Sequence, residues 1–166
     1  MKNLILYASK YGTTAVCAKT LADLLKGETT IQDVAGQSQA DPGSFDRIII
    51  GSSVYMGQVN KKIKNFCEQH KSELLKKELV IFICSGIPEN FGAVIEANFS
   101  VEIRNHAALL AYFGGELNLS KMNFIDRTIA GLMAKQKGEA QPVVKIDEAA
   151  IRTLAESLNE EVNSID

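Results

Sequence analysis

Residues 4–14 read Leu-Ile-Leu-Tyr-Ala-Ser-Lys-Tyr-Gly-Thr-Thr, and this stretch decides the fold. Its first four residues form an apolar run, which is typical of a strand buried on both faces of a sheet. Its second half is rich in hydroxyl residues, contains one glycine and leads into residues 14–26, where apolar side chains recur at helical spacing. A buried strand, a short polar loop and a helix in this order predict the first unit of an α/β domain.

The rest of the chain repeats this alternation. Further strands are expected over residues 29–34, 47–50, 79–84 and 109–113, and further helices over 59–70, about 91–104 and a C-terminal segment with Asp147 as its N-cap. This pattern predicts a parallel sheet with helices on both faces, which is a three-layer, doubly wound, five-stranded α/β fold. No repeat or linker divides the chain, so we expect residues 1–166 to form a single domain.

The composition narrows the function classes. The 166 residues are 46% hydrophobic, and 18 Lys and Arg stand against 20 Asp and Glu, for a net charge of −2. The apolar content is too high for a disordered chain, and the basic excess typical of nucleic-acid binding is missing. Three widely spaced cysteines, Cys17, Cys67 and Cys84, form neither a disulfide framework nor a zinc motif. We therefore expect a cytoplasmic protein without nucleic acid or a bound metal.

The loop after the first strand is the first candidate binding element. In doubly wound folds, ligands bind outside the carboxyl ends of the strands. Backbone N–H groups and the helix dipole favour a phosphate at this position, Gly12 permits close approach of the backbone, and Lys10 offers a positive charge. The alternative is an ordinary loop with a threonine N-cap. The candidate phosphate-binding residues are Ser9, Lys10, Tyr11, Gly12, Thr13 and Thr14.

Several other phosphate-binding classes are excluded by their motifs. The chain contains neither G-x-G-x-x-G nor G-x-x-x-x-G-K-[ST], so a Rossmann dinucleotide fingerprint and a P-loop are both missing. The first strand ends without the carboxylates of a phosphoacceptor domain. A C-x5-R phosphatase loop is also excluded, because Cys17 is followed at that spacing by Asp23 and Cys84 by Asn90.

The pattern [ST]-x-x-G-x-T, present here as Ser9, Gly12 and Thr14, resembles the phosphate loop of flavodoxins. The resemblance continues at residues 50–57, after the third expected strand, and at residues 84–86 and 91–94, after the fourth. It implies a flavodoxin-like fold with strand order 2-1-3-4-5 and FMN as the cofactor. The flavin itself would then carry the electrons or the hydride, and no catalytic side chain is expected.

The resemblance also implies which residues surround the flavin ring. Tyr55 and Met56 are expected to form one wall, and the loop from Ser85 to Phe91 the other. Backbone contacts to the ring edge are expected from Ser52, Ser53 and Gly57, and Gly86 suits a close approach of the backbone. The full set expected at the ring is Ser52, Ser53, Val54, Tyr55, Met56, Gly57, Ser85, Gly86 and Phe91.

Within this family, the chain is most similar to the menaquinone-dependent protoporphyrinogen oxidase group. The shared features are the opening strand, a G-x-S-[IV]-x-x-G loop at residues 51–57, and Asp126-Arg127 before an apolar helix. They imply an FMN-dependent oxidoreductase with a quinone or another small-molecule electron acceptor. Two alternatives stay open, namely a non-catalytic electron carrier with a redox partner protein, and a binding module that has lost the flavin.

Residues 118–140 form an extra segment that a minimal carrier would not need. Within it, residues 122–135 place apolar side chains on one face. Such a segment either packs against the sheet edge or docks peripherally on the inner face of a membrane to reach quinone.

Overall fold

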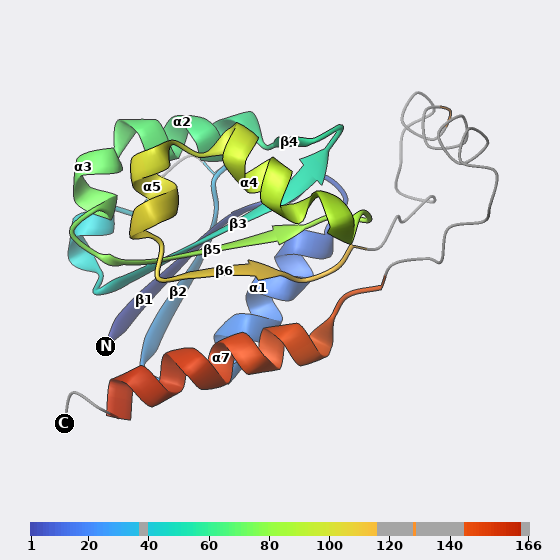
Figure 1. Ribbon diagram of the computed structural model, residues 1–166. Coiled ribbons are helices and arrows are strands. Elements are labelled where there is room, and N and C mark those ends of the chain that lie inside the picture. The colour runs from blue at the N-terminus through green and yellow to red at the C-terminus, as the bar shows by residue number, and fades with distance from the viewer. Residues whose placement is uncertain (37–39, 116–127, 129–144, 164–166) are drawn as a thin grey trace.

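The computed structural model describes residues 1–36, 40–115, 128 and 145–163. Its centre is a parallel sheet in the order β2-β1-β3-β5-β6 (Figure 1). The strands are β1 (Lys2–Ala8), β2 (Glu28–Asp33), β3 (Arg47–Tyr55), β5 (Glu78–Cys84) and β6 (Leu109–Tyr112). This confirms the expected order 2-1-3-4-5 for the five main strands. A short strand, β4 (Gln58–Val59), is an addition that pairs antiparallel with β3.

Helices cover both faces of the sheet, as expected for a three-layer fold (Figure 1). One face carries α1 (Thr13–Leu24) and α7 (Glu148–Asn163). The other carries α2 (Lys61–Gln69), α3 (Lys71–Leu74), α4 (Phe91–Asn98) and α5 (Val101–His106). No helix in the described part of the chain is long and apolar enough to cross a bilayer.

The apolar runs supply two separate cores because alternate side chains of a strand point to opposite faces. In β1, Leu4 and Leu6 belong to the core under α2–α5, whereas Ile5 belongs to the core under α1 and α7. The strands β3 and β5 divide their side chains in the same way. Each of these central strands is therefore apolar on both faces, and this explains why the runs show no alternation in the sequence.

Strand β3 is longer than the sequence indicates. Residues 51–55, expected as a loop, continue the strand, because Gly51 to Ser53 pair with β5 and Val54 and Tyr55 pair with β4. A Cβ at Gly51 would lie 2.1 Å from the Phe82 ring, so the glycine makes room for a core aromatic. The end of the strand thus reaches beyond the apolar run that predicts it.

The helix expected over 91–104 is two helices, α4 and α5, because Phe99 between them adopts an extended conformation (φ −122°, ψ 141°). The C-terminal helix begins as predicted, since Asp147 Oδ1 accepts a hydrogen bond from Ala150 N at 2.9 Å. The extra segment and the Asp126-Arg127 pair fall, apart from residue 128, outside the described residues.

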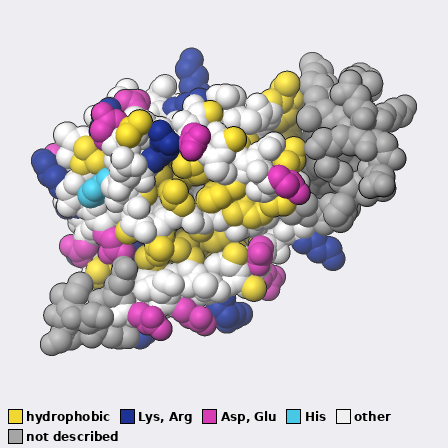
Figure 2. Space-filling view, in the orientation of Figure 1, with side chains coloured by type: hydrophobic (Ala, Val, Ile, Leu, Met, Phe, Trp, Pro, Cys, Tyr) yellow, Lys and Arg dark blue, Asp and Glu magenta, His cyan; other side chains and the backbone are white. Residues whose placement is uncertain are grey.

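The edge strand β6 borders the part of the surface where hydrophobic side chains gather, between α4 and α5 on one side and α7 on the other (Figure 2). Leu110 in β6 is 40% exposed and Val101 in α5 is 56% exposed. The loops that the sequence predicts as a binding site follow the carboxyl-terminal ends of β1, β3 and β5.

Candidate functional site

The first loop of the candidate site joins β1 to α1. Gly12 is the N-cap of α1 and has a left-handed backbone (φ 98°), and no side chain caps the helix there. Gly12 N donates to Ser9 Oγ at 2.9 Å, which folds the loop back on itself. The first N–H groups of a helix have no intrahelical acceptor, so this helix start favours an anion. The alternative of a threonine N-cap does not apply to α1.

Thr14 takes a different position from the rest of this loop. Its side chain is fully buried beneath the loop, and its Oγ1 has no hydrogen-bond partner among the described residues. The Thr14 hydroxyl therefore does not lie on the loop surface. Only the backbone N–H of this residue belongs to the helix start that favours an anion.

Below the loop, two buried thiols contact each other. Cys17 of α1 and Cys84 at the end of β5 share a hydrogen bond, and both are free cysteines. The bond lowers the pKa of Cys17, whereas the same bond and burial raise the pKa of Cys84. Because both side chains are at most 3% exposed, they act as small core residues that join the helix to the sheet.

A cation–π contact brings the first loop to the end of β3. Lys10 Nζ lies 3.6 Å from the centroid of the Tyr55 ring and 5.3 Å from that of Tyr11. The positive charge of Lys10 is therefore held at the carboxyl edge of the sheet, over two aromatic rings. The sequence predicts each residue separately for this edge but contains no signal for their pairing, since Lys10 and Tyr55 lie on different elements.

The end of β3 forms a tight hairpin with β4. Tyr55 pairs with Gln58, so Met56 and Gly57 are the two central turn residues, with φ values of 50° and 74°. The Met56 side chain is 67% exposed. Ser53, Val54 and Tyr55 are half-buried. The hairpin thus presents an aromatic and a thioether side chain at the edge of the sheet.

Ser52 has a structural role that the sequence does not indicate. It is 1% exposed, and its hydroxyl donates to the Ser53 carbonyl at 2.9 Å and accepts from Asn60 N at 3.0 Å. Asn60 is the N-cap of α2. The Ser52 side chain therefore ties β3 to the start of α2, and its contribution to a ligand would be limited to the backbone.

The third loop follows β5 and is held by the segment after β6. Ser85 N donates to Gly114 O at 2.8 Å, and the Tyr112 hydroxyl donates to the Ser85 carbonyl. A Cβ at Gly115 would lie 2.6 Å from the carbonyl carbon of Ser85, so only glycine permits this approach. By contrast, a Cβ at Gly86 would meet nothing within 4 Å. The backbone is thus closely packed at Ser85 and open at Gly86.

The start of α4 completes the third loop. The Phe91 ring meets the Tyr112 ring edge-on, with 6.1 Å between centroids. The pKa of Tyr112 is raised by burial and then by the nearby Glu89 carboxylate, so its hydroxyl keeps its proton. Tyr112 and Gly115 both support this loop. The sequence did not predict them for the site, because they lie in β6 and just after it, far along the chain from the loop they contact.

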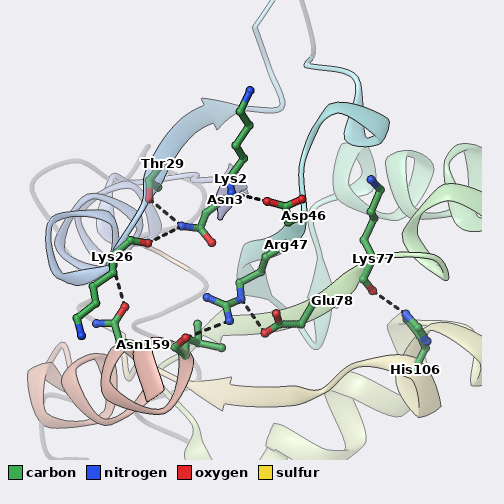
Figure 3. Close-up of polar contacts among 11 residues, drawn as sticks. Lys2, Asn3, Lys26, Thr29, Asp46, Arg47, Lys77, Glu78, His106 and Asn159 are labelled. Carbon is green, nitrogen blue, oxygen red and sulfur yellow. Dashed lines mark hydrogen bonds and ion pairs between the residues drawn. The ribbon is translucent and has the colours of Figure 1, made fainter. Parts of the chain in front are cut away.

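The amino-terminal edge of the sheet has a dense polar network instead of open loops (Figure 3). The fully buried Arg47 donates from Nε to Glu78 Oε1 at 2.7 Å and from Nη2 to the Leu158 carbonyl at 3.1 Å. Nearby, His106 Nε2 lies 2.8 Å from the Lys77 carbonyl oxygen. These groups bind backbone and one another across elements, so this edge is structural.

Other titratable groups do not form a second site in the described part of the chain. His70 lies against the Phe66 ring with 4.5 Å between centroids. Burial raises the pKa of Cys67 to about 12. The described residues include no cluster of His, Cys, Asp and Glu side chains that could hold a metal ion.

Comparisons with known proteins agree with this fold. The family model described as "Flavodoxin domain" matches residues 4–142. A Leishmania major protein named protoporphyrinogen IX dehydrogenase [quinone] is 24% identical over 168 residues, which cover 93% of this chain and 73% of the relative.

Solved structures show the same fold. A flavodoxin from Streptococcus pneumoniae TIGR4 superposes with a TM-score of 0.59 at 16% identity, covering 97% of this chain and 99% of the other. A Fusobacterium nucleatum flavodoxin bound to flavin mononucleotide superposes with a TM-score of 0.51 at 12% identity, covering 70% and 72%.

Proposed function

Because this chain belongs to the flavodoxin domain family, we propose that its carboxyl-edge loops bind FMN and that it is an FMN-dependent oxidoreductase with a quinone or similar small-molecule acceptor. The observation that carries the choice of reaction is the Leishmania major relative, a quinone-linked dehydrogenase by name, whose similarity extends over 93% of this chain. The family and the convergence of three loops at one edge support the cofactor.

The β1–α1 loop is assigned to the FMN phosphate. Its helix start has no side-chain cap, its Gly12 permits close approach of the backbone, and Lys10 adds a positive charge. Backbone N–H groups of residues 10, 11, 13 and 14 would bind the phosphate, together with the hydroxyl groups of Ser9 and Thr13, while Gly12 N–H closes the loop onto Ser9 Oγ. The Thr14 hydroxyl lies buried below the loop, without a hydrogen-bond partner among the described residues.

The isoalloxazine ring is assigned to the space between the other two loops. Tyr55 and Met56 supply an aromatic and a polarisable surface on one side, and residues 85–91 supply backbone N–H groups and Phe91 on the other. When bound, the flavin supplies the electron or hydride transfer. The residues of the chain would orient the ring, exclude water from its faces and tune its potential through the backbone N–H of Gly86, since the N–H groups of Ser85 and Ile87 bind within the loop region.

A non-catalytic electron carrier is the second candidate function. It is favoured by the chemistry of the described carboxyl-edge loops, residues 9–12, 56–57 and 85–90, which contain no histidine or cysteine for proton transfer. A carrier needs only the flavin and a docking partner. Against it stands the net charge of −2, since a strongly acidic surface would steer a carrier to a basic partner.

One experiment separates these functions. The purified chain is incubated with FMN, freed of unbound cofactor, reduced anaerobically and mixed with a menaquinone analogue, with and without a porphyrinogen. Rapid catalytic turnover without any partner protein supports the oxidoreductase. Stoichiometric reoxidation without turnover supports the carrier, and a protein that stays colourless after incubation with FMN contradicts both.

A further inference from the structure

Asn98, the last residue of α4, connects this helix to the β3–β4 hairpin. Its Nδ2 donates to the Gly57 carbonyl at 2.9 Å, and its Oδ1 accepts from Val59 N at 3.1 Å. Nδ2 also donates to the Val94 carbonyl at 2.8 Å within α4. The residue is only 8% exposed. Both amide hydrogens and the amide oxygen are therefore used, and two of the three bonds go to the hairpin, at its second turn residue and in β4.

The hairpin needs such support because of its backbone. Met56 and Gly57 both have positive φ, as the two central residues of a type I′ turn do. Glycine adopts this conformation freely, but for a methionine it costs on the order of 1 kcal/mol. The bonds from Asn98 to Gly57 O and Val59 N act on the residues that follow Met56. They offset this cost and hold the turn in one geometry.

The same helix also belongs to the other wall of the proposed ring site. Phe91 begins α4 and packs against Tyr112, whereas Asn98 ends α4 and binds the hairpin that carries Tyr55 and Met56. Seven helical steps separate the two residues, which is about 10 Å along the axis. The length of α4 therefore sets the spacing between the two walls.

We propose that Asn98 is a positioning residue for the flavin ring, which fixes the Tyr55–Met56 wall relative to the Phe91 wall. This inference rests on the proposed function, since it assigns a role within the same FMN site. The role requires an uncharged amide, because a carboxylate at residue 98 would set negative charge against the carbonyl oxygens of Gly57 and Val94 and would remove both N–H donors.

The test compares Asn98→Asp and Asn98→Leu with a matched control, Asn3→Leu. Asn3 is also a buried asparagine, with Nδ2 bonded to the Lys26 carbonyl at 3.1 Å and to Thr29 Oγ1 at 3.2 Å, but it lies at the amino edge of the sheet (Figure 3). For each protein, the Kd values of FMN and of riboflavin, the flavin midpoint potential and the thermal midpoint of unfolding are measured.

We expect the Asn98 variants to bind FMN and riboflavin each about tenfold more weakly, which corresponds to the loss of one or two buried hydrogen bonds. The ratio of the two Kd values should stay constant because the phosphate loop is untouched. The midpoint potential should shift, because the ring wall has moved. Asn3→Leu should lower the thermal midpoint but leave both Kd values and the potential unchanged.

A folded Asn98 variant with wild-type Kd values and potential contradicts the positioning role, and so does a change in the FMN-to-riboflavin ratio. If both variants fail to fold, amide exchange in the wild-type protein decides the question. FMN should slow exchange at Val59 N–H and leave the amino-edge Glu28 N–H unchanged, and equal effects overturn the inference. Wild-type protein that binds no FMN contradicts the proposed function instead.

Discussion

Gly12 holds the conformation on which the proposed phosphate site depends. Its φ of 98° lies in the left-handed region, directly before the first residue of α1. Its N–H is directed to Ser9 Oγ, so the loop closes over the helix start. A side chain at this position would carry whatever charge it has to the place where the phosphate is expected. Residue 12 therefore controls both the backbone conformation of the loop and the charge next to the proposed phosphate site.

Gly12→Asp should abolish FMN binding, with an affinity at least about 100-fold lower, because a carboxylate would face the phosphate dianion. Gly12→Asn is the matched control, since asparagine has the same shape, tolerates a left-handed backbone and carries no charge. It should retain most of the affinity. The measurement is quenching of FMN fluorescence by each variant. Equal loss in both variants would mean that the residue matters only through its backbone.

Cys67 makes the stability of the fold sensitive to alkaline pH. Burial, and then the Glu68 charge, raise the pKa of its thiol from 9.0 to about 12 in the folded protein. Between these two values the unfolded chain has lost the proton and the folded protein has kept it. The stabilisation is complete below pH 9 and is lost as pH rises toward 12, at about 1.4 kcal/mol per pH unit.

Cys67→Ala should reduce this dependence. The variant loses some stability at every pH because it leaves a cavity, but its free energy of unfolding should fall less steeply between pH 9 and 11 than that of the wild type. Urea unfolding at pH 7, 9 and 10.5 measures both slopes. Parallel curves for the two proteins would show that folding does not change the pKa of the Cys67 thiol.

At the scale of elements, the loops that follow β1, β3 and β5 are each held by a partner from elsewhere in the chain. The β3–β4 hairpin is held by Asn98 of α4, and the loop after β5 is held by Tyr112 and Gly114 at the end of β6. The loop after β1 is tied to β3 by the contact of Lys10 with Tyr55. The candidate site is thus built from loops whose positions depend on neighbouring elements.

Gly115→Ala should disturb the loop after β5, because its Cβ would lie 2.6 Å from the carbonyl carbon of Ser85. We expect a destabilisation of about 1–3 kcal/mol and weaker FMN binding. Gly92→Ala is the matched control, since a Cβ there meets nothing within 4 Å. It should stabilise α4 by about 0.5–1 kcal/mol. Chemical denaturation measures both, and equal effects of the two substitutions would contradict the close packing at Ser85.

At the scale of the whole molecule, the carboxyl-terminal and amino-terminal ends of the strands form two different edges of the sheet, with different roles. The carboxyl edge carries loops with a cation, aromatic rings and an open helix start. The amino edge carries the network that joins α7 to the rest of the fold (Figure 3). There, Asn159 accepts from Lys26 N at 2.8 Å and donates to the Leu24 carbonyl at 2.9 Å, while Arg47 reaches the Leu158 carbonyl. Stability and binding can therefore be altered separately.

Glu78→Gln tests this separation. It removes the carboxylate that neutralises the fully buried Arg47 guanidinium, so we expect a loss of about 2–3 kcal/mol in the free energy of unfolding. The double variant Arg47→Met/Glu78→Gln should be less destabilised than the single one, because no buried charge is left unpaired. Urea unfolding gives the energies, and FMN titration of the folded proteins should give wild-type Kd values. Additive losses would contradict the pairing.

The sequence by itself determined the layers, the five main strands and the loops at which to look for a site. A strand with a continuous apolar run must be buried on both faces of a sheet. This requirement concerns consecutive residues, so it can be recognised in the sequence alone. The same reasoning predicted the Asp147 cap, and it predicted a loop from Ser9 to Gly12 that leads into a helix, which the structure shows to have no side-chain cap.

Only the tertiary structure decided how these loops are held. The extension of β3 through Tyr55 depends on pairing with β4 and β5, and the full burial of the Thr14 side chain depends on the packing of α1 against the sheet. The role of Asn98 rests on bonds to residues about 40 positions away. Such contacts join single side chains to distant backbone groups, have no periodicity along the chain, and exist only once the sheet has brought the strand ends to one edge.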